Sequence, residues 1–355
     1  MVTAIAWRQM VAHFPNLKGI NGQHQQTIQI KQSLSAPRLR FWLANDYGNQ
    51  PLPIQDMTVT NADSETMSVT VNRQSSFQVP AWGRLWSDWL PLPIQAGTWL
   101  TITLVSPEVN PQTLAQSFDQ TLIRVIGRNQ PYFYGPVAIE IERAEPVKSL
   151  LFFGDSLTNQ GYYSAAFSQK LMTAAPDQWG LTNGGISGNR LLRAGNSTSV
   201  WSPSFGLAGL NRLPALLSEQ SVDWLIFMEG LNDLLHPGNG SPQTELPTAA
   251  ALIAGIKQVQ TLAATRSLRL TLATITPFKT GVIGEKPAWT PAKEQIRQTV
   301  NTYLRSSPNT VDFDQLVATA DQRLAATFDC GDHIHFSAAG GELVAQFLAA
   351  QLAID

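Results

Sequence analysis

Residues 149–159 read SLLFFGDSLTN and decide the fold of the second half of the chain. SLLFFG is a continuous apolar run ending in Gly154, which is typical of a strand buried on both faces, as parallel strands usually are. Ser156 then lies at the carboxyl end of this strand, close to a helix N-terminus whose free N–H groups favour developing negative charge. This position indicates a nucleophile. A helix cap is the alternative, because Ser and Asp are favoured caps, and this segment alone does not decide between them.

Two later apolar runs have the same character, WLIFMEG at 224–230 and LRLTLATITP at 268–277. Helical stretches lie between and after them, including one that opens with Thr290 as cap and Pro291 at the first helical position, and a last one that begins near Ser337. Strands that alternate with helices predict right-handed crossovers and an α/β domain with a doubly wound parallel sheet. Ligands of such sheets lie beyond the carboxyl ends of the strands.

The region between residues 27 and 142 has a different pattern. Its segments are short, alternate apolar with polar residues and are separated by Gly, Pro, Asn and Asp, which is typical of half-buried antiparallel strands. The clearest are TIQIKQS at 27–33, RLRFWLA at 38–44, MSVTVNR at 67–73, TWLTITLV at 98–105 and VAIEIER at 137–143. We therefore expect an antiparallel, jelly-roll-like β-sandwich over residues 1–145 and the α/β domain over residues 146–355.

Composition and charge exclude several classes of function. Lys and Arg total 24 against 26 Asp and Glu, a formal charge of -2, which argues against a basic face for nucleic acid. The one cysteine, Cys330, excludes an internal disulfide and any multi-thiolate metal site. MVTAIAWRQM lacks the order of a signal peptide and no run approaches the ~20 apolar residues of a membrane span, so we expect a soluble cytoplasmic protein without membrane insertion.

Two glycine-containing segments follow the first two parallel strands. NGGISGNR at 183–190 forms a turn in which a backbone N–H can approach a ligand closely, although tight turns explain most such glycines. GLND at 230–233 places Asn232 beyond a strand, where its side-chain N–H can reach an oxyanion. An Asx turn or a helix cap is the alternative for Asn232.

The segment DHIHFS at 332–337 is the most informative of all. A serine nucleophile needs a base, and that base needs a carboxylate to fix its tautomer and stabilise the imidazolium. Asp332 and His335 lie on one short loop, so a single turn can bring the carboxylate to the imidazole. The chain has only five histidines, and among them we expect His333 to support the loop.

The segments GDSLT, GISGN, GLND and DHIH, in this order, resemble the four blocks of the SGNH hydrolases, also called the GDSL esterase/lipase superfamily. This resemblance implies a flavodoxin-like hydrolase domain. It also implies that Ser156 is the nucleophile, His335 the base and acid, and Asp332 the carboxylate that orients it. The backbone N–H groups of Ser156 and Gly188, with the Asn232 side chain, would form the oxyanion hole.

The resemblance extends to the front of the chain but leaves some choices open. The second block tolerates several glycines, so Gly185 is an alternative to Gly188. Residues 27–54 and 86–104 are similar to the β domain that precedes the hydrolase domain in one bacterial branch of the superfamily. We expect the tryptophans of this β domain to pack in its core or at a domain interface, and stacking on sugars is the alternative. These tryptophans are Trp7, Trp42, Trp82, Trp86, Trp89 and Trp99.

Other catalytic templates are missing from the sequence. It has no GxSxG elbow, no Walker A sequence and no GxGxxG after a strand, and no cluster of His and carboxylate residues has metal-site spacing. We therefore expect no cofactor and no metal, and we interpret Cys330 as incidental. The expected chemistry is ester hydrolysis through an acyl-enzyme, with a small-molecule ester as substrate.

The substrate pocket is the least determined feature. Aromatic residues near the motifs are its candidates, although each can equally be a packing residue: Tyr162, Trp201, Phe205, Phe278 and Trp289. The loop GNSTSVWSPSFG at 195–206 is rich in small polar residues, which favours short acyl groups, including acetyl esters of saccharides. The alternatives are a lipase, lysophospholipase or thioesterase acting on longer chains, an acyltransferase, and a carbohydrate-binding protein with an inert hydrolase domain.

Overall fold

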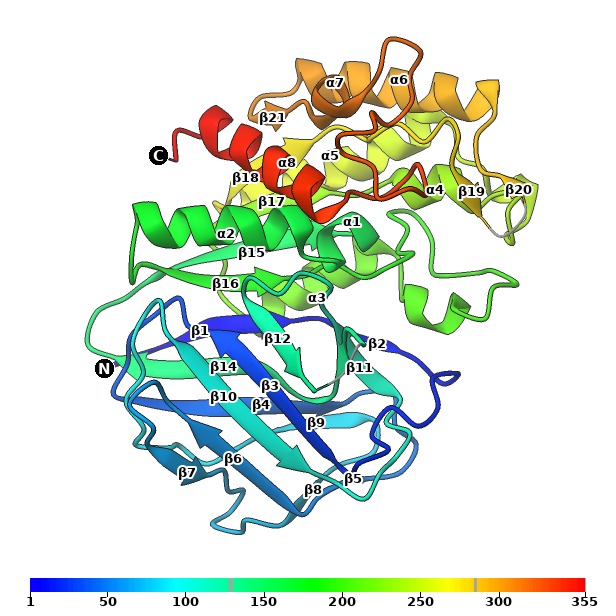
Figure 1. The fold of residues 1–355 in the computed structure, drawn as a ribbon. Helices are drawn as coiled ribbons and strands as arrows, with labels where there is room; N and C mark the ends of the chain where they lie inside the picture. Colours follow the sequence, from blue (N-terminus) through cyan, green and yellow to red (C-terminus); the bar gives the residue numbers. More distant parts are fainter. Residues whose placement is uncertain (128–129, 284–285, 355) are drawn as a thin grey trace. The chain divides into compact units, whose positions relative to one another are not determined.

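The computed structural model describes residues 1–127, 130–283 and 286–354, and the chain divides into two compact units (Figure 1). Unit 1 holds Met1–Ser149 and Ser168–Asn183, whereas unit 2 holds Leu150–Phe167 and Gly184–Asp355. The chain thus leaves unit 1, returns to it once and then completes unit 2. The domain boundary at residues 145 and 146 stays a prediction.

Unit 2 is built on parallel strands. They pair in the order β21-β18-β17-β15 and cover Lys148–Gly154 (β15), Trp224–Met228 (β17), Arg269–Ala273 (β18) and Thr310–Val311 (β21). Every residue of β17 and the last five of β15 are buried, because these strands carry apolar side chains on both faces. The predicted parallel α/β architecture is confirmed.

Helices connect and follow these strands. The helices are α1 (Ser156–Asn159), α2 (Tyr162–Ala174), α3 (Gly209–Glu219), α4 (Leu231–Leu235), α5 (Ala249–Thr265), α6 (Pro291–Ser306), α7 (Phe313–Val317) and α8 (Ala338–Gln351), with 3₁₀ turns η1 (Ser202–Phe205) and η2 (Gln243–Glu245). Two short strands, β19 (Val282–Ile283) and β20 (Lys286–Pro287), pair antiparallel. Thr290 and Ser337 cap α6 and α8, so both predicted helix starts are confirmed. None of the described helices has the length and hydrophobicity of a membrane span.

Unit 1 consists mainly of antiparallel strands in two larger sheets. The first has the order β16-β1-β14-β4-β9 and comprises Trp179–Asn183 (β16), Val2–Gln9 (β1), Gly135–Arg143 (β14), Arg38–Asn45 (β4) and Gly83–Trp86 (β9). The second has the order β12-β3-β10-β6-β7 and comprises Ile123–Ile126 (β12), Gln25–Lys31 (β3), Trp99–Val105 (β10), Asp56–Thr60 (β6) and Thr66–Ser68 (β7). Smaller pairings join β13 (Tyr132–Phe133), β11 (Thr113–Gln116) and β2 (Val11–His13), and β5 (Leu52–Ile54) with β8 (Phe77–Val79). The predicted antiparallel β region is confirmed, but the strand predicted over residues 67–73 is wrong beyond Ser68, where β7 ends, since Asn72 and Arg73 adopt left-handed backbones with φ of 52° and 65°. β16 pairs in parallel with β1.

The core of unit 1 follows from strand alternation. Leu39, Phe41 and Leu43 on β4 are fully buried, as are the alternate apolar residues of β10, Leu100, Ile102 and Leu104. A Cβ atom on Gly135 of β14 would come within 2.7 Å of Leu104 Cδ1, so the two sheets contact each other closely there. Each fully buried side chain of this size contributes about 1.5–3 kcal/mol to folding.

The tryptophans of unit 1 lie mostly against arginines. Trp42 and Trp86 stack with ring centroids 5.1 Å apart, and Arg84 lies 4.8 Å from the Trp42 ring. Arg40 lies over both Trp86 and Trp89. Since guanidinium groups and indoles already cover each other here, these ring faces serve packing within the unit rather than presenting a bare aromatic platform.

Candidate active site

Ser156 is the first residue of α1, and only Asp155 separates it from the end of strand β15. The cap of α1 is Asp155, whose carboxylate accepts a hydrogen bond from Leu157 N at 3.0 Å. Gly154 is required before this turn, because a Cβ atom there would overlap the carbonyl oxygen of Met228. The Ser156 side chain therefore does not cap the helix, which excludes the simpler of the two interpretations of this segment.

The loop before α8 brings a base and a carboxylate to this serine. Ser156 Oγ lies 2.7 Å from His335 Nε2, and His335 Nδ1 lies 2.6 Å from Asp332 Oδ2. Because the ionised carboxylate only accepts hydrogen bonds, Nδ1 carries the proton and Nε2 is left to accept from the serine hydroxyl. This arrangement can deprotonate Ser156 as the hydroxyl attacks a carbonyl carbon.

The carboxylate of Asp332 is held firmly in its ionised form. Its second oxygen accepts the backbone N–H groups of Ile334 at 2.9 Å and His335 at 2.8 Å. Burial alone would raise the pKa of Asp332, but the hydrogen bond and charge of His335, together with these two backbone donors, hold that pKa well below its ordinary value. A carboxylate so stabilised can orient the imidazole without taking its proton.

A second Asp–His pair shapes the same loop. His333 Nδ1 lies 2.6 Å from Asp329 Oδ2, and Asp329 Oδ1 accepts the N–H groups of Gly331 and His333. His333 adopts a left-handed backbone with φ of 64°, which costs free energy in a residue with a side chain and is stabilised here by these bonds. The contacts agree with the expectation that His333 supports the loop.

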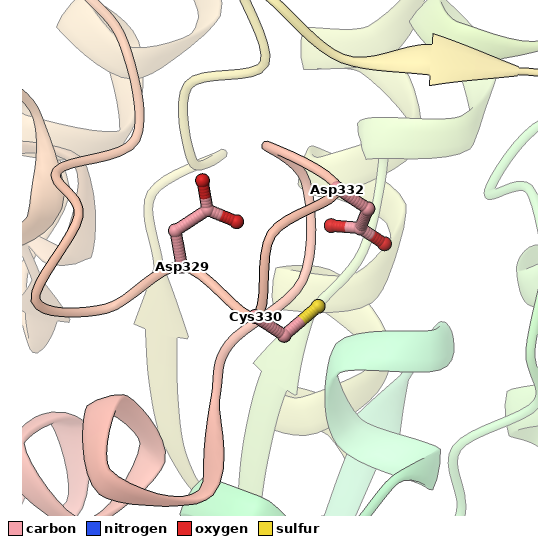
Figure 2. A group of neighbouring side chains, drawn as sticks. All are labelled: Asp329, Cys330 and Asp332. Carbon is pink, nitrogen blue, oxygen red and sulfur yellow. The ribbon is translucent and has the colours of Figure 1, made fainter.

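The structure groups Asp329, Cys330 and Asp332 on this loop, which the sequence did not indicate (Figure 2). One ligand atom from each lies within 4.8 Å of the others. Burial raises the pKa of the Cys330 thiol and the charges of both carboxylates add to this, so the thiolate needed to bind a soft metal is disfavoured. A cation held there would also compete with His335 for Asp332, and we assign these residues no metal role.

The glycine loop packs differently around its two candidate donors. A Cβ atom on Gly185 would overlap Asn159 N, and Asn159 donates its side-chain N–H to the Gly185 carbonyl at 2.9 Å. Gly188 has a left-handed φ of +76°, and a Cβ atom there would overlap the ring of Phe205. Gly185 is thus explained by packing against α1. The assignment of Gly188 to an oxyanion hole stays a prediction.

Asn232 is the second residue of α4, and its helix is capped by Gly230, so Asn232 is not a cap. Its side-chain Nδ2 donates one hydrogen to the carbonyl of Asn189, the residue after Gly188, at 2.9 Å. A primary amide carries a second N–H, which is the group an oxyanion would require. Its neighbour Asp233 accepts the backbone N–H groups of Leu191 and Leu192, which ties α4 to the glycine loop a second time.

The candidate pocket residues are distributed unevenly. Phe205 lies against Gly188, and its ring is 4.9 Å from that of His236. Tyr162 contacts α8, since a Cβ atom on Gly341 would come 2.5 Å from Tyr162 Cβ, and Trp201 is 42% exposed. Phe278 is fully buried and so presents no surface to a ligand. Trp289 donates its indole N–H to Glu294 and lines a cavity of about 450 Å³ along α6.

Sequence reasoning missed the polar residues beneath the motifs. Asp155, Glu229 and Asp233 are three carboxyl groups buried close to each other, and burial raises the pKa of Asp155 and of Asp233 to about 6. Arg212 and Asn189 bind several main-chain carbonyls in the same region. Asn189 stands in the quoted GISGN segment, whereas no motif marks Arg212.

Residues 152–343 match the GDSL-like lipase/acylhydrolase family, which is more than half of the chain. The chain belongs to this family. The match includes all four motif segments and gives an independent basis for a hydrolase of the GDSL type acting on acyl groups. No curated protein matches the chain significantly.

Several solved structures are similar to the chain of this GDSL hydrolase. An acetyl xylan esterase, AlAXEase, shares 15% identity over 57% of this chain and 98% of its own, with a TM-score of 0.40. A GDSL-like lipase from Bacteroides thetaiotaomicron VPI-5482 shares 16% identity over 60% and 91%, with a TM-score of 0.42. The aryl esterase of M. smegmatis shares 18% identity over 58% and 99%, with a TM-score of 0.41. At these TM-scores the similarities carry no argument about substrate.

Proposed function

We propose that this GDSL hydrolase is a serine esterase that cleaves short-chain carboxylic esters through an acyl-enzyme. The observation that carries the proposal is the continuous chain of hydrogen bonds from Ser156 Oγ through the His335 imidazole to Asp332, at 2.7 Å and 2.6 Å. A nucleophile, a base and an orienting carboxylate in this order are what acyl transfer requires.

In the first half-reaction, Ser156 Oγ attacks the ester carbonyl carbon while its proton passes to Nε2 of His335. The oxyanion of the tetrahedral intermediate accepts hydrogen bonds from the N–H groups of Ser156 and Gly188 and from the Asn232 side chain. The bond to the alcohol oxygen then breaks, the alcohol leaves with the proton from His335, and the acyl group stays on Oγ.

In the second half-reaction, the oxygen of a water molecule attacks the acyl carbonyl carbon while His335 accepts a proton from that water. Collapse of the second tetrahedral intermediate breaks the bond to Ser156 Oγ. The serine takes back its proton from His335, and the carboxylic acid is released. The cycle requires no metal or cofactor, because all four proton transfers run through the same imidazole.

Short acyl groups fit the surroundings of the candidate oxyanion hole. The Phe205 ring occupies the space next to Gly188, and the loop that carries it has small polar residues at 196–199. A long apolar chain would need a continuous apolar groove there. Acetyl esters of saccharides are the substrates that best suit a polar entrance, and lipase, lysophospholipase or thioesterase activity on longer chains is the alternative.

A panel of 4-nitrophenyl esters tests this proposal. We expect hydrolysis by the intact chain to be fastest on acetate and butyrate and to fall beyond butyrate, with no hydrolysis by Ser156→Ala. Rates that rise steadily with acyl length would favour the lipase alternative. A folded chain that hydrolyses no ester or thioester but binds oligosaccharides would favour the carbohydrate-binding alternative.

The same reaction run with an added alcohol separates a hydrolase from an acyltransferase. We expect water to remain the main acceptor at moderate alcohol concentrations, because nothing among the described site residues marks a second acceptor site. A dominant ester product would instead indicate transfer. We also propose the cytoplasm as the location, because a reducing cytosol suits a chain with a single cysteine, and cell fractionation tests it.

A further inference from the structure

Arg212 lies on α3, outside the four motif segments, and its side chain is only 7% exposed. Its guanidinium donates three hydrogen bonds: from Nη2 to the carbonyl of Gly154 at 3.3 Å, from Nη1 to the carbonyl of Gly184 at 2.9 Å, and from Nε to the side-chain oxygen of Asn189 at 2.9 Å. Gly154 precedes the Asp155–Ser156 turn, while Gly184 and Asn189 lie on either side of Gly188. One side chain therefore binds both the nucleophile turn and the glycine loop.

Asn189 extends this network to the third motif segment. Its backbone carbonyl accepts the Asn232 side-chain N–H at 2.9 Å, and its own Nδ2 donates to the carbonyls of Phe205 and Leu207. The position of the Asn232 amide thus depends on Asn189, and the side chain of Asn189 depends on Arg212. Arg212 is thus hydrogen bonded to Gly154, two residues before Ser156, and to Asn189, which follows Gly188 and accepts the Asn232 amide.

Two further groups of unit 2 lie near the Arg212 guanidinium. Glu229 Oε2 lies 3.7 Å from Arg212 Nη2, and the Glu229 carboxyl group has no hydrogen-bond partner in the described part of the chain although its side chain is fully buried. The face of the guanidinium lies 4.3 Å from the centre of the Phe153 ring, which fixes its plane. Carbonyl acceptors and an aromatic ring thus orient Arg212.

We propose that Arg212 is a positioning residue for catalysis, which holds the nucleophile turn, the Gly188 loop and, through Asn189, the Asn232 amide in the geometry of the oxyanion hole. This inference rests on the proposed esterase function. A lysine cannot replace it, because a single ammonium group cannot reach three acceptors in one plane. Small displacements of catalytic groups lower the rate while substrate binding is retained.

The test compares Arg212→Lys with Arg297→Lys on a 4-nitrophenyl acetate assay. Arg297 is a matched control, since its side chain is also fully buried and donates to a main-chain carbonyl, that of Ile275, but it touches none of the motif segments. We expect Arg212→Lys to lower kcat about 10- to 100-fold with KM changed less than about threefold, and Arg297→Lys to leave kcat within about twofold. Circular dichroism and Tm measure the folded fraction of each.

A double-mutant cycle separates positioning from general stabilisation. If Arg212 acts through Asn232, then Arg212→Lys in the Asn232→Ala background should lower kcat far less than it does in the wild-type chain. Asn189→Ala removes the side chain that links Arg212 to Asn232 but keeps the carbonyl that Asn232 uses. It should also lower kcat, by less than Arg212→Lys because the bonds to Gly154 and Gly184 remain, and show the same non-additivity with Asn232→Ala. This variant replaces Arg212→Lys if that chain does not fold.

The outcomes are distinguishable from those for the proposed function. Wild-type hydrolysis that is lost in Ser156→Ala establishes the esterase independently of Arg212. A folded Arg212→Lys or Asn189→Ala with kcat within about twofold of wild type, or losses that multiply fully in the double variants, would overturn the positioning role and leave the esterase standing. A wild-type chain without esterase activity overturns both.

Discussion

At the residue scale, the imidazole of His335 is the point where the chemistry is decided. It is hydrogen bonded on one side to the Ser156 hydroxyl and on the other to Asp332, and the Asp332 carboxylate is stabilised by two backbone N–H groups. The neighbouring pair of Asp329 and His333 has the same kind of hydrogen bond, but among the described residues no serine is hydrogen bonded to the His333 ring. The Asp329–His333 pair can therefore serve as a control for variants of the Asp332–His335 pair.

Replacing Asp332 by Asn is expected to lower kcat on an acetate ester by about 10⁴-fold, because an amide in this place favours the wrong tautomer of His335. Asp329→Asn, which alters the equivalent bond to His333, should leave kcat within about threefold. Steady-state kinetics on both purified variants make the comparison. Equal losses in the two variants would mean that the loop, rather than the His335 tautomer, sets the rate.

Replacing Asn232 by Ala is expected to lower kcat about 100- to 1,000-fold with KM little changed, because one donor to the oxyanion is lost in the transition state. Asn239→Ala is the matched control, since Asn239 is also buried and also donates its side-chain N–H to a carbonyl, that of Leu235 on α4. An unchanged kcat in Asn232→Ala would exclude Asn232 from the oxyanion hole.

At the element scale, helix caps connect stability with catalysis. Ser337 caps α8 directly after the His335 loop, and Thr248 caps α5 away from the site. We expect Ser337→Ala and Thr248→Ala each to lower the free energy of unfolding by about 1 kcal/mol, but only Ser337→Ala to lower kcat, because it loosens the loop that carries the base. Urea unfolding and kinetics on the same samples test this, and a rate loss in both variants would contradict it.

The elements that could be predicted are those with local signals. The apolar runs before Gly154 and around residues 224–230 predicted buried parallel strands, and Thr290 with Pro291 predicted the start of α6. The return of β16 to pair with β1 could not be predicted, because its parallel partner lies far away in the sequence and no turn chemistry records such a pairing.

The residues around the site divide in the same way. Ser156, Asn232, Asp332 and His335 stand in short segments whose chemistry is readable in order along the chain. Arg212 lies within a helix, and its proposed role follows only from the two segments that packing brings to it, the nucleophile turn and the glycine loop. Phe278 is an aromatic residue near the motifs, as a pocket residue would be, but it is completely buried. The sequence does not show which aromatic side chains are buried.

At the scale of the whole molecule, buried carboxyl groups give stability a pH dependence. Burial raises the pKa of Asp155 and Asp233 to about 6, above the ordinary value of about 4. Between these values the folded chain binds more protons than the unfolded chain, so both groups lower stability progressively as the pH rises from about 4 to about 6. Asp332, whose pKa is lowered, contributes stability that is lost only as the pH falls below about 4.

Urea unfolding of wild type and Asp233→Asn at pH 4, 5, 6 and 7 tests whether ionisation of Asp233 lowers the free energy of unfolding. The difference in unfolding free energy, wild type minus variant, should decrease from pH 4 to pH 6 and then level off, since the variant cannot ionise. A difference that grows with pH over this range would show that Asp233 is stabilised in its charged form.

Intact-mass analysis after treatment with a fluorophosphonate tests whether Ser156 is an activated nucleophile. We expect one adduct per folded wild-type chain, located on Ser156 by peptide mapping, much slower labelling of His335→Ala and none of Ser156→Ala. A folded wild-type chain that stays unlabelled, or an adduct on another residue, would contradict the account.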